Sequence, residues 1–323
     1  MNTLSKKGLL CLLCTLTFIM PCAAFWQDRV QALAEESLIT SSAGHPPVVD
    51  TVETETVMDV MVRFPLPASD PDGDTVTLKL IDQPRLGTAT FENGNLIYTP
   101  ASHRTGTDQF SYCAVDVMGN QSEPARISVK INRNASGITY ADMTYNPNHL
   151  AAVRLAQEDI FLGEKVGSSY FLHPMQTVTR NEFIAMAAAT AELDLTETAY
   201  TDFQDDSALS SWVKPYISAA AEAGFIQGYQ TASGTAEIRG EKPITVSEAA
   251  VIVSNLLKQQ EIPVATPTSG TVSYQVVPAW AETAVNTLSA ANILPASTLD
   301  SNEPLTRETA CVMLYHVMCL CDS

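Results

Sequence analysis

The hydrophobic pattern of this chain changes once, near residue 140, and this change limits the fold more than any other feature. Between His45 and Arg133, short runs rich in Val, Thr, Ile, Tyr and Phe alternate with turn clusters such as SDPDGDT. About seven such runs over roughly 90 residues predict an antiparallel β-sandwich. From Tyr140 onward, apolar residues recur every three or four positions, which predicts amphipathic helices. We therefore expect an all-β domain followed by an all-α domain.

The helical half contains three related segments. SWVKPYISAAAEAGFIQG and AWAETAVNTLSAANILPA align from Trp212 and Trp280, and HLAAVRLAQEDIFLG aligns with them without a tryptophan. The alignment brings Asp159, Gly224 and Asn292 to one position, just after each helix. These residue types tolerate the left-handed conformation that ends helices. We therefore predict a left-handed residue at each of the three helix ends.

Each segment then opens a second helix on a related motif, VTRNE, ITVSE or LTRET. Thr179 with Glu182, and Thr245 with Glu248, fit the capping box, in which the two side chains satisfy backbone N–H groups at the start of a helix. These threonines and glutamates would be needed for folding alone. The sequence therefore predicts a capped helix at both places.

Two of these motifs carry an arginine that helix capping does not explain. Arg180 and Arg307 directly follow the capping threonine. A cation in the first turn opposes the helix macrodipole and costs roughly 0.3 kcal/mol or more. The same unfavourable residue at two repeat positions indicates an anionic partner.

The pattern of an FxD-like start, a tryptophan-led helix, a turn, a loop and an ITRAE-like opening resembles the S-layer homology (SLH) repeat. The starts are YADM at Tyr140–Met143 and YTDF at Tyr200–Phe203. The resemblance implies a pseudo-threefold helical bundle that binds cell-wall polysaccharide non-covalently, either a pyruvylated secondary polymer or a modified peptidoglycan. The repeats that it defines cover residues 139–190, 200–258 and 273–319, with a linker at 259–272.

The resemblance also implies roles for particular residues. Arg180 and Arg307 would meet the acidic group of the glycan, through the bidentate reach of a guanidinium. Trp212, Trp280 and Gly224 would line or shape the grooves. The alternative for each tryptophan is a place in the core between helices.

The repeats depart from the SLH pattern in ways that reduce the expected number of working grooves. Val246 replaces the arginine in the second repeat, and the first repeat has no tryptophan. The third repeat has no turn glycine, reads SYQV in place of FxD, and has a short loop. We expect one or two of the three grooves to bind.

Residues 45–133 resemble bacterial Ig-like or cadherin-like modules, through SDPDGDT, QPRLGT, YTP, GTDQFSY and DVMGN. Such modules are spacers and adhesive units of surface proteins. Asp70, Asp72 and Asp74 carry oxygens that could bind calcium, but the stretch is not an EF-hand, because Ile81 stands at the twelfth position. A turn stabilised by Asp and Gly is the favoured interpretation, and a calcium site is the alternative.

The N-terminus reads as a secretory signal at 1–24, followed by a linker at 25–44. It has a basic start, an apolar run and small residues before the expected cleavage point; an uncleaved anchor is the alternative. The formal net charge of −18 makes nucleic acid an unexpected partner. Outside the signal, a disulfide is expected in an oxidising compartment, although its pairing cannot be read; the cysteines are Cys113, Cys311, Cys319 and Cys321.

The motifs of common enzymes are missing from the sequence. The five histidines have no zinc-protease spacing, and the chain has no nucleophile elbow or phosphate loop. We therefore predict a non-enzymatic, secreted protein of a bacterial surface, held on the wall by SLH repeats and displaying an Ig-like module, with other surface proteins as further partners. The alternatives are an interaction or assembly scaffold whose degenerate repeats have lost wall binding, and a wall-glycan hydrolase using groove carboxylates.

Overall fold

The computed structural model describes residues 44–92, 94–264, 276–295 and 300–321. The predicted signal segment and most of both predicted linkers lie outside the described residues. The chain forms two compact units, and the boundary between them runs through the β-rich region. One unit contains residues 44–52, 66–83 and 109–127, and the other contains the remaining described residues.

Nine strands lie in the described part of the N-terminal region. One sheet has four strands in the order β2-β9-β8-β5, another has three in the order β3-β7-β6, and β1 pairs with β4. Burial alternates along β9, as the period of a half-buried strand requires. The strands are β1 (Val48–Val49), β2 (Val52–Val57), β3 (Val62–Pro65), β4 (Ala68–Ser69), β5 (Thr77–Leu80), β6 (Gly87–Glu92), β7 (Asn95–Pro100), β8 (Gly106–Val115) and β9 (Ala125–Asn132).

The C-terminal region is mainly helical, so the predicted order of a β-rich region before a helical one is confirmed. It is not purely α, because two short antiparallel hairpins lie between the helices. The elements are η1 (Ala141–Met143), α3 (His149–Gln157), β10 (Glu164–Val166), β11 (Ser169–Phe171), α4 (Arg180–Thr190), η2 (Asp206–Ala208), α5 (Lys214–Glu222), β12 (Tyr229–Gln230), β13 (Ala236–Glu237), α6 (Val246–Gln259), α7 (Glu282–Ala290) and α8 (Arg307–Cys321).

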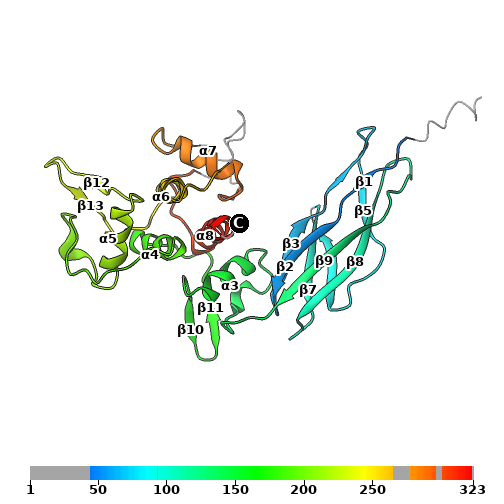
Figure 1. Ribbon diagram of the computed structural model, residues 1–323, viewed down its shortest axis with the longest axis horizontal. Coiled ribbons are helices and arrows are strands. Elements are labelled where there is room, and N and C mark those ends of the chain that lie inside the picture. The colour runs from blue at the N-terminus through cyan, green and yellow to red at the C-terminus, as the bar shows by residue number, and fades with distance from the viewer. Residues whose placement is uncertain (1–43, 93, 265–275, 296–299, 322–323) are drawn as a thin grey trace, which may run out of the picture. The chain divides into compact units, whose positions relative to one another are not determined.

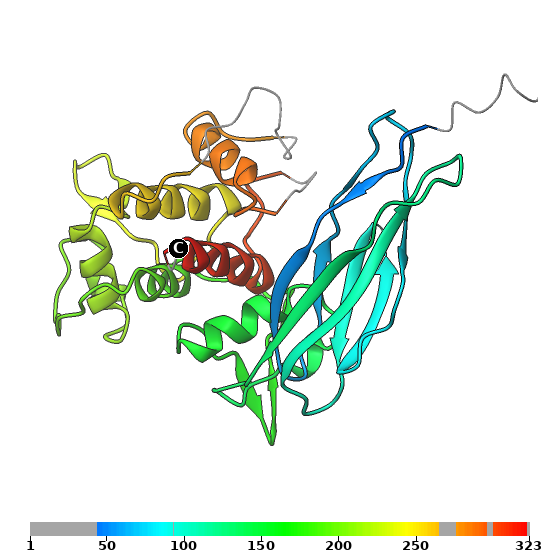
Figure 2. The same cartoon turned by 45° about the vertical axis from the view of Figure 1, so that its right-hand side comes forward.

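Three helices of this region contact one another, and each also contacts one outer helix (Figures 1 and 2). The inner helices are α4, α6 and α8, which begin at the three related motifs. The outer helix α5 packs on α4, α7 packs on α6, and α3 packs on α8. Each outer helix therefore packs on the inner helix of a different repeat, so that no repeat buries its apolar faces alone.

The residues that precede the three capping threonines form a closed ring of backbone hydrogen bonds. The N–H of Val178 donates to the carbonyl of Leu305 at 3.0 Å, that of Leu305 to Ile244 at 2.8 Å, and that of Ile244 to Val178 at 3.0 Å. All three side chains are buried. The ring holds the starts of the three inner helices close together.

The predicted helix ends are confirmed. Asp159, Gly224 and Asn292 have φ values of 55°, 78° and 56°, each two residues beyond the end of its helix. Both predicted capping boxes are also present, at Thr179 and Thr245. These features follow from local backbone chemistry, which explains why the sequence predicts them well.

The FxD-like motif is displaced in the second repeat. In the first repeat, Asp142 accepts hydrogen bonds from the N–H groups of residues 172–173, at 3.0 and 2.8 Å. Asp205 does the same for residues 238–239, at 2.9 and 2.8 Å. The start predicted at Tyr200–Phe203 is therefore three residues too early, because hydrogen bonding across the repeat places FQD, and not YTD, at the equivalent position.

Candidate functional site

Arg180 stands at the first position of α4, where the capping box fixes the backbone. Its N–H donates to the carbonyl of Lys242 at 2.9 Å, so the residue is also held by the segment before the next repeat motif. The side chain is largely buried, with 8% of its surface exposed for the whole residue. A guanidinium placed so deeply is fixed in position by the fold.

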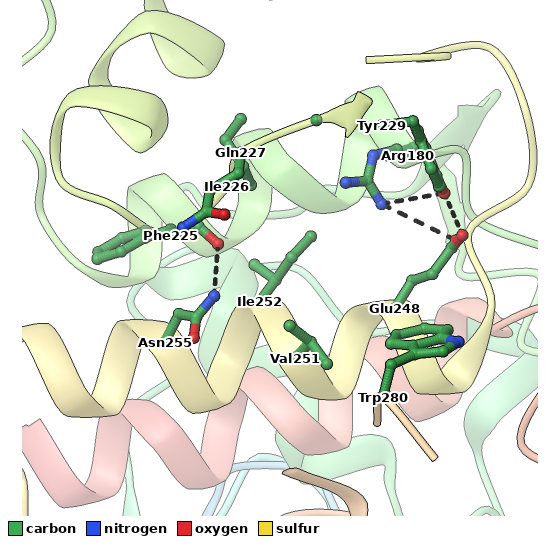
Figure 3. Close-up of a pocket in the computed structure, with 11 residues that line it drawn as sticks. Arg180, Phe225, Ile226, Gln227, Tyr229, Glu248, Val251, Ile252, Asn255 and Trp280 are labelled. Carbon is green, nitrogen blue, oxygen red and sulfur yellow. Dashed lines mark hydrogen bonds and ion pairs between the residues drawn. The ribbon is translucent and has the colours of Figure 1, made fainter. Parts of the chain in front are cut away.

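This guanidinium lies at one end of a cavity of about 580 Å³. The cavity is assembled from all three repeats: Arg180 comes from the first, the turn after α5 and one side of α6 from the second, and Trp280 from the third. Figure 3 shows these side chains around the opening. The lining residues are Arg180, Phe225, Ile226, Gln227, Gly228, Tyr229, Glu248, Val251, Ile252, Asn255 and Trp280.

The polar end of the cavity joins a cation, a phenol and a carboxylate. The guanidinium lies over the ring of Tyr229, with its central carbon 4.8 Å from the ring centroid. Nη1 of Arg180 donates to the Tyr229 hydroxyl at 3.5 Å and lies 3.9 Å from a carboxylate oxygen of Glu248. The Tyr229 hydroxyl donates to the other Glu248 oxygen. Burial, together with this hydrogen bond, raises the pKa of Tyr229 to about 12, so the phenol stays protonated at neutral pH.

Arg180 also keeps donor capacity that the protein does not use. Among the described residues, no hydrogen-bond partner is present for its buried Nε. A guanidinium offers five N–H donors, and a buried donor left unmatched costs about 1–3 kcal/mol. The cavity therefore contains a guanidinium with an unmatched donor beside an aromatic ring and a carboxylate, which is a suitable environment for a polar ligand with an acidic group.

Trp280 lies at the open side of the cavity and is 62% exposed. An indole this exposed is not core packing, which was the alternative for this residue. Aliphatic carbons of Val251 and Ile252 line the same space, and the Asn255 amide donates to the carbonyl of Phe225 at 3.2 Å. In Figure 3 the charged groups lie at one end of the cavity, and the aliphatic side chains of Ile226, Val251 and Ile252 lie away from them.

Arg307, at the first position of α8, has different surroundings. Its Nη1 donates to the carbonyl of Leu172 at 3.2 Å, and its guanidinium carbon lies 5.5 Å from the centroid of the Phe161 ring. Within the described part of the chain, its buried Nε has no hydrogen-bond partner either. The structure therefore does not bring Arg307 and Arg180 into one site, and each contacts the turn of the repeat that follows it in the ring.

Two other predicted groove residues do not line the Arg180 cavity. Gly224 lies two residues beyond the end of α5 and directly before the lining residue Phe225, and an added Cβ there would lie 3.1 Å from Nε2 of Gln259. Trp212 is 54% exposed and meets Tyr216 edge-on, with 6.4 Å between ring centroids. Val246, in the position of the missing arginine, is buried and supplies no polar group.

Of the three aspartates that could bind calcium, Asp70 and Asp72 have carboxylate oxygens that accept hydrogen bonds within the protein. One oxygen of Asp70 accepts from the N–H groups of Asp72 and Asp74, at 2.9 and 3.2 Å, as in the favoured turn. Both oxygens of Asp72 are engaged by His45. Across the described residues, no three His, Cys, Asp or Glu side chains form a group suited to a metal ion. A calcium ion at these aspartates stays the alternative to the favoured turn.

The four cysteines outside the signal are not joined in disulfides, contrary to expectation. Cys113 and Cys311 are buried, and Cys319 and Cys321 are exposed. The last two are two residues apart on α8, a spacing that places side chains on different sides of a helix. Burial raises the pKa of the Cys311 thiol to about 12, so this cysteine is an inert core residue.

Sequence reasoning missed Tyr229 and the second contact of Glu248. Glu248 is predicted as a capping residue, and it is one, but it also faces Arg180. Tyr229 lies 49 positions from Arg180 along the chain, so local pattern does not link them. A sequence signal that could have pointed to Tyr229 is the glycine directly before it, Gly228. In the structure this glycine has a left-handed φ of 69°.

Comparison with known families agrees with this architecture. Residues 44–132 match the family model of the bacterial Ig domain, and residues 202–250 match that of the S-layer homology domain. The protein therefore joins an N-terminal Ig-like module to S-layer homology sequence, as predicted. Both families are non-catalytic. An S-layer homology domain suggests attachment to the cell wall, and an Ig domain suggests a surface module.

Solved structures offer distant similarities. One is the endo-fucoidan hydrolase MfFcnA4 of glycoside hydrolase family 107, at 20% identity over 29% of this chain and 14% of that one, with a TM-score of 0.25. Another is a mutant SrpA adhesin from Streptococcus sanguinis, at 16% identity over 39% of this chain and 84% of that one, also with a TM-score of 0.25. This chain thus spans a small part of the first, and such scores support no inference.

Curated proteins show no significant match to the chain. In the part of the chain that the structure describes, no helix has the length and apolarity that a membrane span requires.

Proposed function

We propose that the protein is secreted and held non-covalently on cell-wall polysaccharide by its helical region, which forms a pseudo-threefold SLH unit. The Ig-like module would then act as a spacer or adhesive unit on the bacterial surface. The observation that carries this proposal is the Arg180 cavity, which is lined by both a buried guanidinium with an unmatched Nε and an exposed tryptophan.

The chemistry of the cavity fits an acidic sugar. A carboxylate or ketal-linked acid would pair with the guanidinium, which binds planar anions in a bidentate way. Trp280 would stack on a sugar face, and Glu248 would accept a hydroxyl hydrogen. A pyruvylated secondary polymer and a modified peptidoglycan both meet these requirements. Arg307, with its own unmatched Nε, is the second proposed anchor, and Trp212 is a further proposed glycan-binding residue.

The test is co-sedimentation of the secreted chain with purified wall sacculi from the source bacterium. We expect the wild type to pellet, and Arg180→Ala combined with Arg307→Ala to stay in solution while circular dichroism shows it folded. Trp280→Ala should weaken binding without a change in fold, because this side chain is exposed. Arg126→Ala is the matched control, since it removes an exposed arginine from β9 in the Ig-like region.

Each result has a clear meaning. Equal pelleting of wild type and double variant would place wall binding elsewhere in the chain. No pelleting of the wild type would reject wall anchoring and leave the assembly scaffold as the function. Release of soluble sugar from sacculi would show a hydrolase.

A further inference from the structure

The hydroxyl of Tyr229 lies between the two charged groups of the Arg180 cavity (Figure 3). It donates to Oε1 of Glu248 and accepts from Nη1 of Arg180 at 3.5 Å. The nearest approach of the opposite charges, from Nη1 to Oε2 of Glu248, is 3.9 Å. A closed guanidinium–carboxylate pair has N···O distances of roughly 2.7–2.9 Å. The charges are therefore near each other without being directly hydrogen-bonded.

Glu248 is held in this open position from both oxygens. Oε2 accepts from the N–H of Thr245 at 3.1 Å, as the second half of the capping box. Oε1 accepts from Tyr229. The hydrogen bond from the Tyr229 hydroxyl therefore keeps Oε1, the carboxylate oxygen that the capping box does not hold, away from Arg180.

The ring that carries this hydroxyl is itself fixed. A second guanidinium, that of Arg239, lies 4.6 Å from the Tyr229 centroid, while Arg180 lies 4.8 Å from it. Arg239 is held by Glu237, 3.1 Å from its Nε, and by Asp205, which accepts from its backbone N–H at 2.8 Å. A cation is attracted to the face of an aromatic ring, so both guanidinium groups help to hold the ring in place.

We propose that Tyr229 is a positioning residue, whose hydroxyl holds Glu248 off Arg180 so that the guanidinium remains available to an anionic ligand. This inference rests on the proposed function, because the ligand is the acidic group of the wall glycan. Without the hydroxyl, the Glu248 carboxylate loses a hydrogen-bond donor and can move toward the Arg180 guanidinium to pair with it. The protein's own carboxylate then competes with the ligand.

Near Arg307, the residue that corresponds to Tyr229 is not a tyrosine. The first residue of the hairpin there is Glu164, where the second hairpin begins with Tyr229. Glu164 pairs with His173 at 3.1 Å, and Arg307 donates to the Leu172 carbonyl instead. The positioning role is therefore specific to the Arg180 cavity.

A double-variant cycle on wall sacculi tests the role. Tyr229→Phe keeps the ring and its stacking, and it should weaken binding roughly tenfold, as expected of directly coupled residues. Glu248→Gln keeps the capping box, which accepts glutamine, and removes the competing charge. The combined variant should therefore regain most of the lost affinity. If Tyr229 were only structural, Tyr229→Phe and the combined variant would be weakened equally, and the proposal would be overturned.

A second measurement examines the guanidinium without any glycan. The ¹⁵N NMR signals of the Arg180 side chain, assigned through Arg180→Lys, should shift in Tyr229→Phe and return in the combined variant. Unchanged signals in all variants would overturn the inference, whatever the binding data show. A wild type that fails to bind sacculi, yet shows this shift and its reversal, would reject wall anchoring and keep the positioning role. Tyr216→Phe, on α5, is the control for loss of a tyrosine hydroxyl.

Discussion

At the scale of single residues, Gly163 and Gly228, the glycines directly before the two hairpins, are closely packed by their neighbours. Gly228 has φ of 69°, and a Cβ there would lie 2.8 Å from Cε1 of Phe203 and 2.9 Å from the carbonyl of Glu237. Gly163 repeats the arrangement, with φ of 67° and Tyr140 at 2.8 Å. The aromatic ring of the FxD-like motif therefore packs on a glycine in both repeats.

Replacement of Gly228 by alanine should lower the free energy of unfolding by more than backbone strain alone would. Gly234 also has a positive φ, of 80°, but a Cβ added there would meet no heavy atom of the described residues within 4 Å. We expect Gly234→Ala to lower the free energy of unfolding by about 1 kcal/mol, from left-handed strain alone. Gly228→Ala should lower it clearly further, because neighbours must also move. Urea denaturation followed at 222 nm compares the two, and equal losses would contradict the packing account.

His149 should make the helical region sensitive to acid. Burial lowers its pKa to about 4, from an ordinary value of 6.5, and its Nε2 accepts the N–H of Tyr140 at 3.1 Å. Between these two pH values the unfolded chain binds a proton that the folded chain does not. Stability should therefore fall as pH decreases from 6.5 to 4, by roughly 3 kcal/mol in all for this group.

Urea midpoints measured from pH 7.5 to pH 4 would check this loss. His149→Gln removes the titrating ring, so its stability should depend less on pH than that of the wild type. Burial also lowers the pKa of His316, and comparison of His149→Gln with the wild type separates the contributions of the two histidines to the pH dependence. Identical pH dependence in variant and wild type would show that His149 is not responsible.

At the scale of elements, the inner helices start in two different ways. Thr179 and Thr245 form full capping boxes with a glutamate. At α8, Thr306 accepts from the N–H of Thr309 at 3.2 Å, and the two hydroxyls are 3.0 Å apart. The third motif thus keeps the forward half of the cap, because threonine is too short to reach back as glutamate does.

The cap of α6 should contribute measurably to stability. Thr245→Ala removes the side-chain acceptor for the Glu248 N–H and should lower the free energy of unfolding by about 1 kcal/mol. Thr245→Ser keeps the acceptor and should cost much less. Thermal unfolding of both variants measures the difference, and a serine variant as unstable as the alanine variant would argue against the cap.

At the scale of the whole helical region, the closed ring of hydrogen bonds makes each repeat depend on the others. Leu305, from the third repeat, takes part in two of the three hydrogen bonds of this ring, and Trp280 comes from the same repeat. A chain that stops at residue 264 should therefore lose cooperative unfolding of its remaining helices, and lose wall binding as well. Limited proteolysis and amide exchange would show this as rapid cleavage and exchange in α4 and α6. Full protection there would mean that two repeats are sufficient.

The sequence alone determined the features that depend on a few neighbouring residues. The change from strands to helices, the three left-handed helix ends and both capping boxes follow from residue type and spacing. The displaced FxD motif and the Arg180 cavity did not follow, because both depend on long-range contacts. The tertiary structure decided that Arg180, Tyr229, Glu248 and Trp280 meet, since each outer helix packs on the inner helix of another repeat. Burial of these shared faces, and not any local propensity, selects that arrangement.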